Sequence, residues 1–236
     1  AFGNSITSFS LDSPADYVFG GPGNDRLGKH TFTGNDNEPS TLVGGTDDDT
    51  YYVDNLGDRV IERDRSGSGV DTVYAYVDIA ALFPNVENLV LIKDSGIGFS
   101  DRDLSGSGNS LDNTIVGNNG NNKLYGGAGN DTIYSGQGND ELHGDSGNDE
   151  LHAEGGGDTL YGGIGDDKFW VERVSNARYD LFDSGGSDKL FVQEQSSSNS
   201  VGSFQSLKFA LKGNDLWVEV VPAVFGGAAA GLVILH

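Results

Sequence analysis

The chemistry of this chain starts from aspartates that recur every nine residues. Five consecutive nine-residue units carry an aspartate at the same place, namely Asp131, Asp140, Asp149, Asp158 and Asp167. A stack of carboxylates a few ångströms apart repels strongly unless a cation lies between them. Hard oxygen ligands, in a chain with no cysteine and no clustered histidine, favour calcium over zinc or copper. The spacing therefore predicts a row of calcium sites.

The nine-residue unit also predicts the elements that must hold these aspartates. Residues 108–170 divide without a gap into seven units, each with an apolar residue at its eighth place, from Ile115 to Phe169. The first six residues of a unit are rich in Gly, Asn and Asp, which reach positive φ cheaply and favour a tight turn. The last three are expected to form a short strand, which cannot bury its apolar side chain alone. Stacking solves this, so the pattern predicts two thin parallel sheets around a narrow core.

Two of the units, GGAGNDTIY and GGIGDDKFW, match the nonapeptide GGxGxDxUx, and here the chain resembles the RTX family of calcium-binding repeat proteins. The resemblance implies an all-β fold, a right-handed parallel β-roll or β-helix solenoid with a C-terminal β cap. It also implies type I secretion and folding on contact with extracellular calcium. In the family, turns two units apart on one edge share each ion, through backbone carbonyls and the sixth-place aspartate.

Mapped onto this chain, the resemblance implies several Ca²⁺ ions, held between the turns that begin at 126 and 144, at 135 and 153, and at 144 and 162. Weaker sites are expected at 108/126 and 117/135, because Asn113 and Asn122 replace the aspartate there. The implied ligands of these turns, beside the five aspartates, are Gly126, Gly127, Ala128, Gly129, Asn130, Gly136, Gly138, Asn139, Gly144, Asp145, Gly147, Asn148, Gly155, Gly156, Gly163 and Gly165. Earlier copies of the pattern add Gly23, Asp25, Asp49 and Asp71.

Four segments are predicted along the chain. Residues 1–54 hold N-terminal RTX-like repeats, 55–107 form a β spacer that continues the solenoid, and 108–170 form the main β-roll. Residues 171–236 are expected to form a β cap, with a hairpin that turns at Lys212–Asp215 and covers the open end of the core. For the stretch 222–236, a C-terminal type I secretion signal and a plain terminal strand are both open.

Composition and motifs narrow the function classes. The formal charge of −22 argues against nucleic acid and anionic membranes as partners. The longest apolar run is too short for a transmembrane span. A carboxylate pair could serve glycosidic acid–base chemistry, but aspartates at one fixed phase of a repeat are better explained as metal ligands. With no cysteine, no HExxH and no GxSxG, we expect no enzyme.

The ninth places of the units carry aromatic residues and histidines. Tyr125, His143 and Tyr161 are expected to line one face, and Tyr134, His152 and Trp170 the other. Such columns could stack on sugar rings or on a second protein. Cross-strand packing that stiffens the narrow sheets is the alternative, and the one we favour.

Two functions are left open. The first is a secreted, extracellular structural or interaction protein at the cell surface, part of a surface layer, filament, sheath or adhesin, that assembles with itself or binds another surface protein or a glycan. The second is the accessory C-terminal module of a larger secreted enzyme or toxin, such as a protease, lipase or polysaccharide-modifying enzyme. The absence of an initiator methionine suits a fragment. The intact mass of the native protein would distinguish the two.

Overall fold

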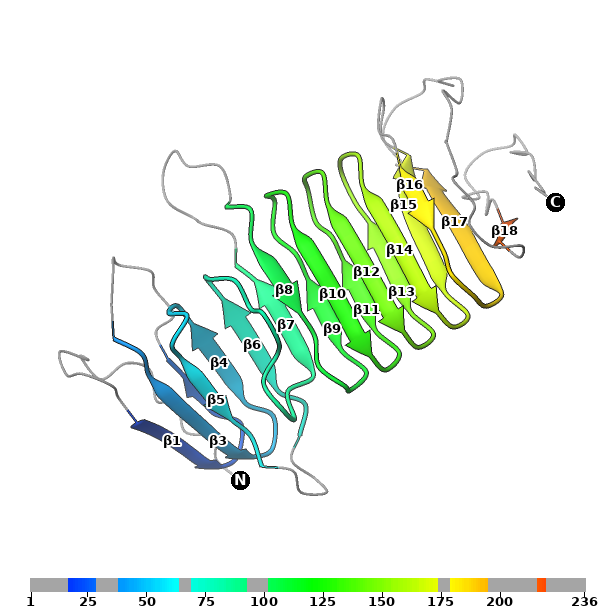
Figure 1. Cartoon of the computed structure of the whole chain (residues 1–236). Coiled ribbons are helices and arrows are strands. Elements are labelled where there is room, and N and C mark those ends of the chain that lie inside the picture. The colour runs from blue at the N-terminus through cyan, green and yellow to red at the C-terminus, as the bar shows by residue number, and fades with distance from the viewer. Residues whose placement is uncertain are drawn as a thin grey trace.

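The structure is a computed structural model, and it describes residues 17–28, 38–63, 69–92, 102–173, 179–194 and 216–219. All the regular secondary structure in these ranges is β-strand. The strands stack side by side along one axis and form an elongated parallel solenoid (Figure 1). The predicted all-β parallel solenoid is confirmed.

Within the described ranges, three parallel sheets build the solenoid. The ten-stranded sheet contains β2 (Arg26–Leu27), β4 (Thr50–Val53), β6 (Thr72–Ala75), β7 (Asn88–Leu91), β9 (Thr114–Val116), β11 (Thr132–Tyr134), β13 (Glu150–Ala153), β15 (Lys168–Arg173), β17 (Asp188–Glu194) and β18 (Leu216–Glu219). The five-stranded sheet contains β8 (Ser105–Ser107), β10 (Lys123–Ala128), β12 (Glu141–Ser146), β14 (Thr159–Ile164) and β16 (Asp180–Phe182). The three-stranded sheet contains β1 (Tyr17–Pro22), β3 (Thr41–Thr46) and β5 (Arg59–Ile61).

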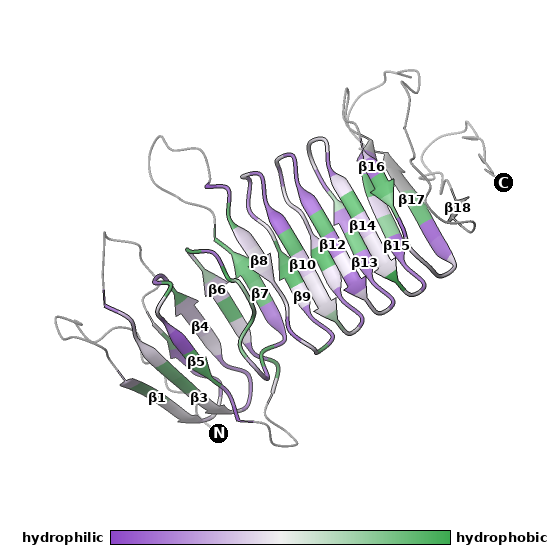
Figure 2. Cartoon of the chain, in the orientation of Figure 1, coloured by the Kyte–Doolittle hydropathy of each residue, from purple (hydrophilic) through white to green (hydrophobic). Residues whose placement is uncertain are grey.

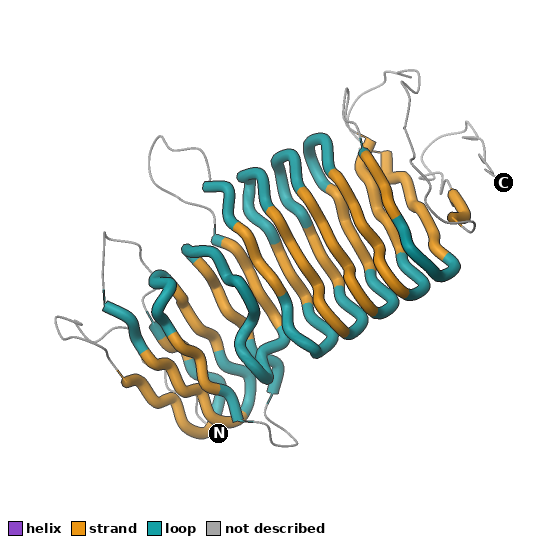
Figure 3. The backbone as a smooth tube through the Cα atoms, viewed as in Figure 1, coloured by secondary structure: helices purple, strands orange, loops and turns teal. Residues whose placement is uncertain are grey.

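The register of the main roll follows from the repeat. Leu124 lies opposite Leu142 in one sheet, and Ile133 lies opposite Leu151 in the other, so one coil contains two nonapeptides. The turns consequently form two rows, one along each edge of the sheets (Figure 3). We call the row that contains residues 126–131, 144–149 and 162–167 the first edge. The row that contains 117–122, 135–140 and 153–158 is the second edge.

The strand lengths differ between the two sheets. The expected three-residue strands occur in β9 and β11, but β10, β12 and β14 each have six residues. The extra residues are the first three of the following turn, which stay in register with the next coil, as Gly127 does with Asp145. The first part of each first-edge turn is therefore sheet, which fixes its backbone carbonyls in a regular stack.

The core is a narrow column of eighth-place side chains. Seven of these residues in the main roll are fully buried, namely Ile115, Leu124, Ile133, Leu142, Leu151, Leu160 and Phe169. In the ten-stranded sheet the column continues toward the N-terminus through Leu89, Val73, Tyr51 and Leu27, which pair in register. Apolar bands cross the strands of the main roll (Figure 2). The N-terminal coils and the spacer thus share one core with the main roll.

The ninth-place side chains stack into two columns, as the repeat predicts. The ring centroids lie 4.6 Å apart for Tyr125 and His143, and 4.4 Å apart for Tyr134 and His152. The second column continues to Trp170 and then Phe191. The rings are nearly parallel, so each interior ring has its faces covered by its neighbours. This arrangement favours the packing interpretation over stacking on a sugar.

The C-terminal predictions fall mostly outside the described residues. The turn at Lys212–Asp215 and the stretch 222–236 both lie there. The described strand β18 pairs in parallel with β17, with Leu216 opposite Asp188. Through this pairing, β18 is the last strand at the C-terminal end of the ten-stranded sheet.

Candidate metal centre: the two edges of turns

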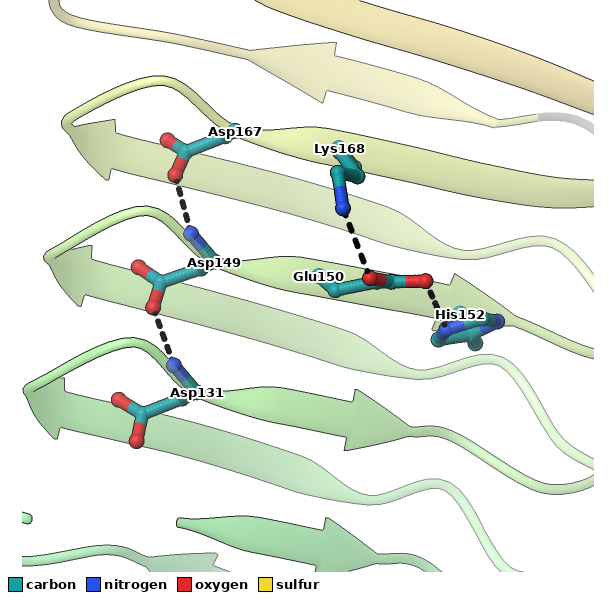
Figure 4. A network of polar contacts seen from close by, with 6 residues as sticks. All are labelled: Asp131, Asp149, Glu150, His152, Asp167 and Lys168. Atoms are coloured by element: carbon teal, nitrogen blue, oxygen red, sulfur yellow. Dashed lines mark hydrogen bonds and ion pairs between the residues drawn. The ribbon is translucent and has the colours of Figure 1, made fainter. Parts of the chain in front are cut away.

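The sixth-place aspartates of the first edge form a ladder along the solenoid axis. The Oδ1 of each aspartate accepts the backbone N–H of the equivalent residue one coil earlier. The Asp149 carboxylate takes the N–H of Asp131 at 2.8 Å, and Asp167 takes that of Asp149 at 2.8 Å (Figure 4). The 18-residue register brings these groups together, so the ladder is a direct product of the repeat.

The second oxygen of each aspartate is buried and has no hydrogen-bond partner. In the described part of the chain this holds for the Oδ2 atoms of Asp131, Asp140, Asp149, Asp158 and Asp167. These residues are only 1–3% exposed. Burial of an uncompensated carboxylate oxygen is strongly unfavourable. The repeat therefore presents, at every coil, an oxygen that requires a positively charged partner.

The raised pKa values of these aspartates indicate the same need for a positively charged partner. Burial raises the pKa of Asp131, Asp140 and Asp149 to about 6, and that of Asp158 and Asp167 to about 7. Repulsion between neighbouring carboxylates adds to the effect of burial on these pKa values at several positions, for example from Asp149 on Asp131. A cation between the turns would neutralise both contributions.

The first-place glycines leave space for such a cation. A methyl group at Gly126 would overlap the Oδ2 of Asp131 and lie 2.7 Å from the carbonyl oxygen of Gly144 in the next coil. At Gly144 the same two atoms are the Oδ2 of Asp149 and the carbonyl oxygen of Gly162. Each first-edge turn thus places a carboxylate oxygen beside a carbonyl oxygen. Carboxylate and carbonyl oxygens are the ligands that calcium prefers, so the residues fit this ion.

The turn conformation depends on residues that accept positive φ. Gly129 has a φ of 119°, and the equivalent Gly147 has a φ of 141°. Asp47 stands at this fourth place in the N-terminal copy and takes a φ of 76°. Aspartate is among the few residues that tolerate this region, because its short side chain can bond locally. The sequence departure at Asp47 therefore preserves the turn.

The second edge repeats the ladder with fewer aspartates. Asp140 accepts the N–H of Asn122 at 2.7 Å, and Asp158 accepts that of Asp140 at 2.9 Å. The first places here are Gly117, Ser135 and Ala153, and not a run of glycines. The predicted ligands Gly136, Gly138, Gly155 and Gly156 all take positive φ at these turns. Their roles as calcium ligands stay predictions.

The two asparagines that replace aspartates satisfy themselves within the protein. Asn113 donates its side-chain amide to the carbonyl oxygens of Val86 and Glu87, at 3.3 and 3.1 Å. Asn122 donates its own to the carbonyl oxygen of Leu104 at 2.9 Å. A neutral amide with such partners needs no cation. This provides a physical reason for weaker sites at the 108/126 and 117/135 turns.

The fifth-place asparagines predicted as ligands form a separate, exposed ladder. The side chain of Asn130 accepts the N–H of Asn148 at 2.9 Å, and Asn148 accepts that of Asp166 at 2.7 Å. On the second edge, Asn139 accepts the N–H of Gly157 at 2.9 Å. Their side-chain oxygens are thus engaged with the next coil. Any contribution of these residues to a calcium site comes from the backbone carbonyl.

The first-edge ladder extends through the N-terminal coils, where the coils are irregular in length. Asp25 donates its N–H to Asp49, Asp49 to Asp71, and Asp71 to Glu87, each at 2.8 Å. Glu87 is not among the site residues predicted from the sequence. The stretch Glu-Asn-Leu-Val repeats the Asp-x-apolar-x pattern with glutamate in place of aspartate, and this signal could have identified it.

Among the residues that the structure describes, two groups of three carboxylates occur at this edge. Asp49, Glu62 and Asp71 form one, and Asp167, Asp183 and Asp188 form the other. Within each group, one carboxylate oxygen from each residue lies within 4.8 Å of the other two. Asp188 continues the ladder, because it accepts the N–H of Asp167 at 2.9 Å. Three of these six residues are predicted from the sequence, whereas Glu62, Asp183 and Asp188 are not.

A parallel solenoid whose turns carry buried carboxylates beside backbone carbonyls defines a class of protein, the metal-binding β-roll. The family model described as RTX calcium-binding nonapeptide repeat (4 copies) matches this chain over three segments, residues 15–27, 107–142 and 134–169. These segments therefore carry RTX calcium-binding nonapeptide repeats, and the predicted resemblance is confirmed for them. The search of curated proteins found no match to the chain. Among the described residues, no helix has the length and apolar character needed to cross a membrane.

Proposed function

We propose that this chain is an extracellular protein whose folding is triggered by calcium, and that it serves as a structural or interaction component at the cell surface. The observation that carries the proposal is the pair of carboxylate ladders. In the described main roll, the Oδ2 atoms of the ladder aspartates are buried and have no hydrogen-bond partner. The residues serve to bind and hold calcium, and we propose no catalytic role for them.

Energetics support the coupling between calcium and folding. A pKa raised from 3.8 to about 6 corresponds to about 3 kcal/mol for each ionised aspartate at neutral pH. Five such residues together approach or exceed the total stability of an ordinary domain, which is about 5–15 kcal/mol. The formal charge of −22 adds repulsion over the whole chain. The metal-free chain is therefore expected to expand, and calcium to compact it.

An extracellular location supplies the ion at a suitable concentration. Extracellular calcium modules use sites with dissociation constants of about 10⁻⁴ to 10⁻³ M. Such sites fill outside the cell and stay empty at the low calcium of the cytosol. RTX repeat proteins are typically secreted, and this association supports the same location. The elongated shape and the shared core suit a stiff rod (Figure 1).

Sedimentation velocity of the purified chain, in EDTA and then in a few millimolar calcium, tests the proposal. Calcium-driven assembly into large regular species is the expected result for a surface component. A change from expanded monomer to compact monomer would retain calcium-triggered folding but favour the accessory module of a larger secreted enzyme or toxin. An unchanged sedimentation coefficient would overturn the proposal. A variant with Asp131, Asp149 and Asp167 all replaced by Asn is the control, because it removes first-edge charge and keeps the acceptor oxygens.

A further inference from the structure

The sheet register shows that acidic side chains replace the first-place glycine at two coils. Val43 pairs with Ile61, so Glu62 follows at the place where Gly44 stands one coil earlier. Tyr161 pairs with Phe182, so Asp183 follows at the place of Gly162. In the regular first-edge coils this place is glycine, and it contributes a backbone carbonyl to the turn before it.

In the N-terminal group, the side-chain oxygen of Glu62 stands in for that carbonyl. A methyl group at Gly44 would overlap the Tyr51 hydroxyl, the Oδ2 of Asp49 and the Oε1 of Glu62, whereas one at Gly126 meets a carboxylate and a carbonyl. Asp49, Glu62 and Asp71 are 1%, 8% and 0% exposed. The Oδ2 atoms of Asp49 and Asp71 have no hydrogen-bond partner. The hydroxyl of Tyr51 donates to Glu62 and holds this side chain toward the group.

The group at the end of the main roll has the same construction. A methyl group at Gly162 would lie 2.5 Å from the Oδ2 of Asp167 and 2.6 Å from the Oδ1 of Asp183. Both of these carboxylate oxygens are buried and have no hydrogen-bond partner. The other oxygen of Asp183 accepts the N–H of Gly185 at 2.8 Å, which orients the carboxylate. Asp188, 2% exposed, completes the group.

We propose that Asp49–Glu62–Asp71 and Asp167–Asp183–Asp188 are two three-carboxylate calcium sites, which bind the ion more tightly than the glycine-type sites do. The third carboxylate replaces a neutral carbonyl and adds a full negative charge at the same place. The number of charged ligands is a main determinant of calcium affinity in oxygen-ligand sites. The inference rests on the binding of calcium by this chain, and it adds Glu62 and Asp183 as ligands.

Electrostatics are consistent with this assignment. Burial, together with the neighbouring Asp71 and Asp49, raises the pKa of Glu62 to about 8. The pKa of Asp71 rises to about 7, also mainly through burial. Three carboxylates in such a small volume repel one another strongly when all are ionised. A divalent cation among them relieves more repulsion than it does at a two-carboxylate turn.

The location of the two sites suggests an order of filling. One site lies in the N-terminal coils, and the other joins the last nonapeptide of the main roll to the segment that follows it. As calcium rises, these two sites fill first and close the coils on either side of the glycine-type turns. The regular turns between them fill afterwards.

Calcium binding to the full chain tests the inference through Glu62→Gln and Asp183→Asn, made singly and together. Both substitutions are isosteric and keep an acceptor for the Tyr51 hydroxyl or the Gly185 N–H. The probe is Ca²⁺ itself, measured by equilibrium dialysis and by its release to a fluorescent chelator in stopped flow. We expect the wild-type chain to hold two ions in its tightest, slowest-released class. Each single variant should weaken one of them about tenfold or more, and the double variant both.

The control is Glu150→Gln, which makes the same change in net charge on a strand at an exposed ion pair with Lys168. It should leave the tight class unchanged. If the double variant retains two tightly held ions, the inference is wrong while calcium binding by the repeats stands. If the wild-type chain binds no calcium, the proposed function fails as well. Each single variant tests its own group alone, so a variant that fails to fold in calcium leaves the test of the other group intact.

Discussion

Replacement of Asp149 by Asn separates the two roles of a ladder aspartate. Its Oδ1 accepts the N–H of Asp131 at 2.8 Å, and its Oδ2 is buried without a partner. Asparagine keeps the acceptor for the N–H and removes the charge. Asn113 occupies the equivalent place two coils earlier in the same ladder, where its own N–H is donated to Asp131 at 2.7 Å, so the fold accommodates an asparagine at this place.

The change that Asp149→Asn makes in the free energy of unfolding should have opposite signs with and without calcium. Burial raises the pKa of Asp149 from 3.8 to about 6, which corresponds to about 3 kcal/mol of unfavourable free energy for the ionised group at pH 7. Without calcium, Asp149→Asn should therefore increase the free energy of unfolding, by up to about 3 kcal/mol less the cost of placing the new amide. With calcium bound, the same substitution removes a ligand and should lower it.

Urea denaturation followed by far-UV circular dichroism measures both signs. One series contains saturating calcium, and the other contains EDTA with sucrose, which raises the population of the metal-free folded state. Asp166→Asn is the matched control, because Asp166 is exposed and also accepts a backbone N–H, from Ser187 at 2.8 Å. It should change the free energy of unfolding little in either series. Equal destabilisation by Asp149→Asn with and without calcium would refute the reasoning and leave only a hydrogen-bonding role.

Four further predictions follow from the same ladders. In EDTA, the metal-free fold should be most stable below about pH 4 and should lose stability as the pH rises through about 6 to 7. The reason is that the folded aspartates hold protons that the unfolded ones release. If acid titrations show stability rising over this range, the pKa shifts are contradicted. The calcium midpoint of folding should be higher at pH 5.5 than at pH 7.5, since protons compete for the same oxygens. Asp140→Ala with Asp149→Ala should raise that midpoint, and an unchanged midpoint would count against the site assignment. Gly144→Ala should weaken calcium binding, because the added methyl overlaps the Asp149 oxygen, whereas Ala153→Gly at the opposite edge should not.

The main roll could be predicted from the sequence because the residues of each nine-residue unit determine its turn, its strand and its core side chain. Apolar residues at the eighth place, from Ile115 to Phe169, identify the core, and a fixed nine-residue unit determines which residues share an edge. Asp131, Asp149 and Asp167 therefore had to form one column as soon as two units made a coil. The parallel solenoid, the calcium family and the aromatic columns all follow from this phase.

Outside the main roll the nine-residue period is lost, and only the tertiary structure shows which carboxylates lie side by side. Successive ladder partners are separated by 24 residues from Asp25 to Asp49, by 22 to Asp71, and by only 16 to Glu87, against 18 in the regular coils. No fixed period predicts these separations, so Glu62 and Asp183 could not be placed beside their partners from sequence. Only the pairing of β5 with β3, and of β16 with β14, brings those two carboxylates into the turns. The division of each aspartate into one bonded and one unpartnered oxygen is likewise a product of strand register, because it depends on which backbone N–H the neighbouring coil presents.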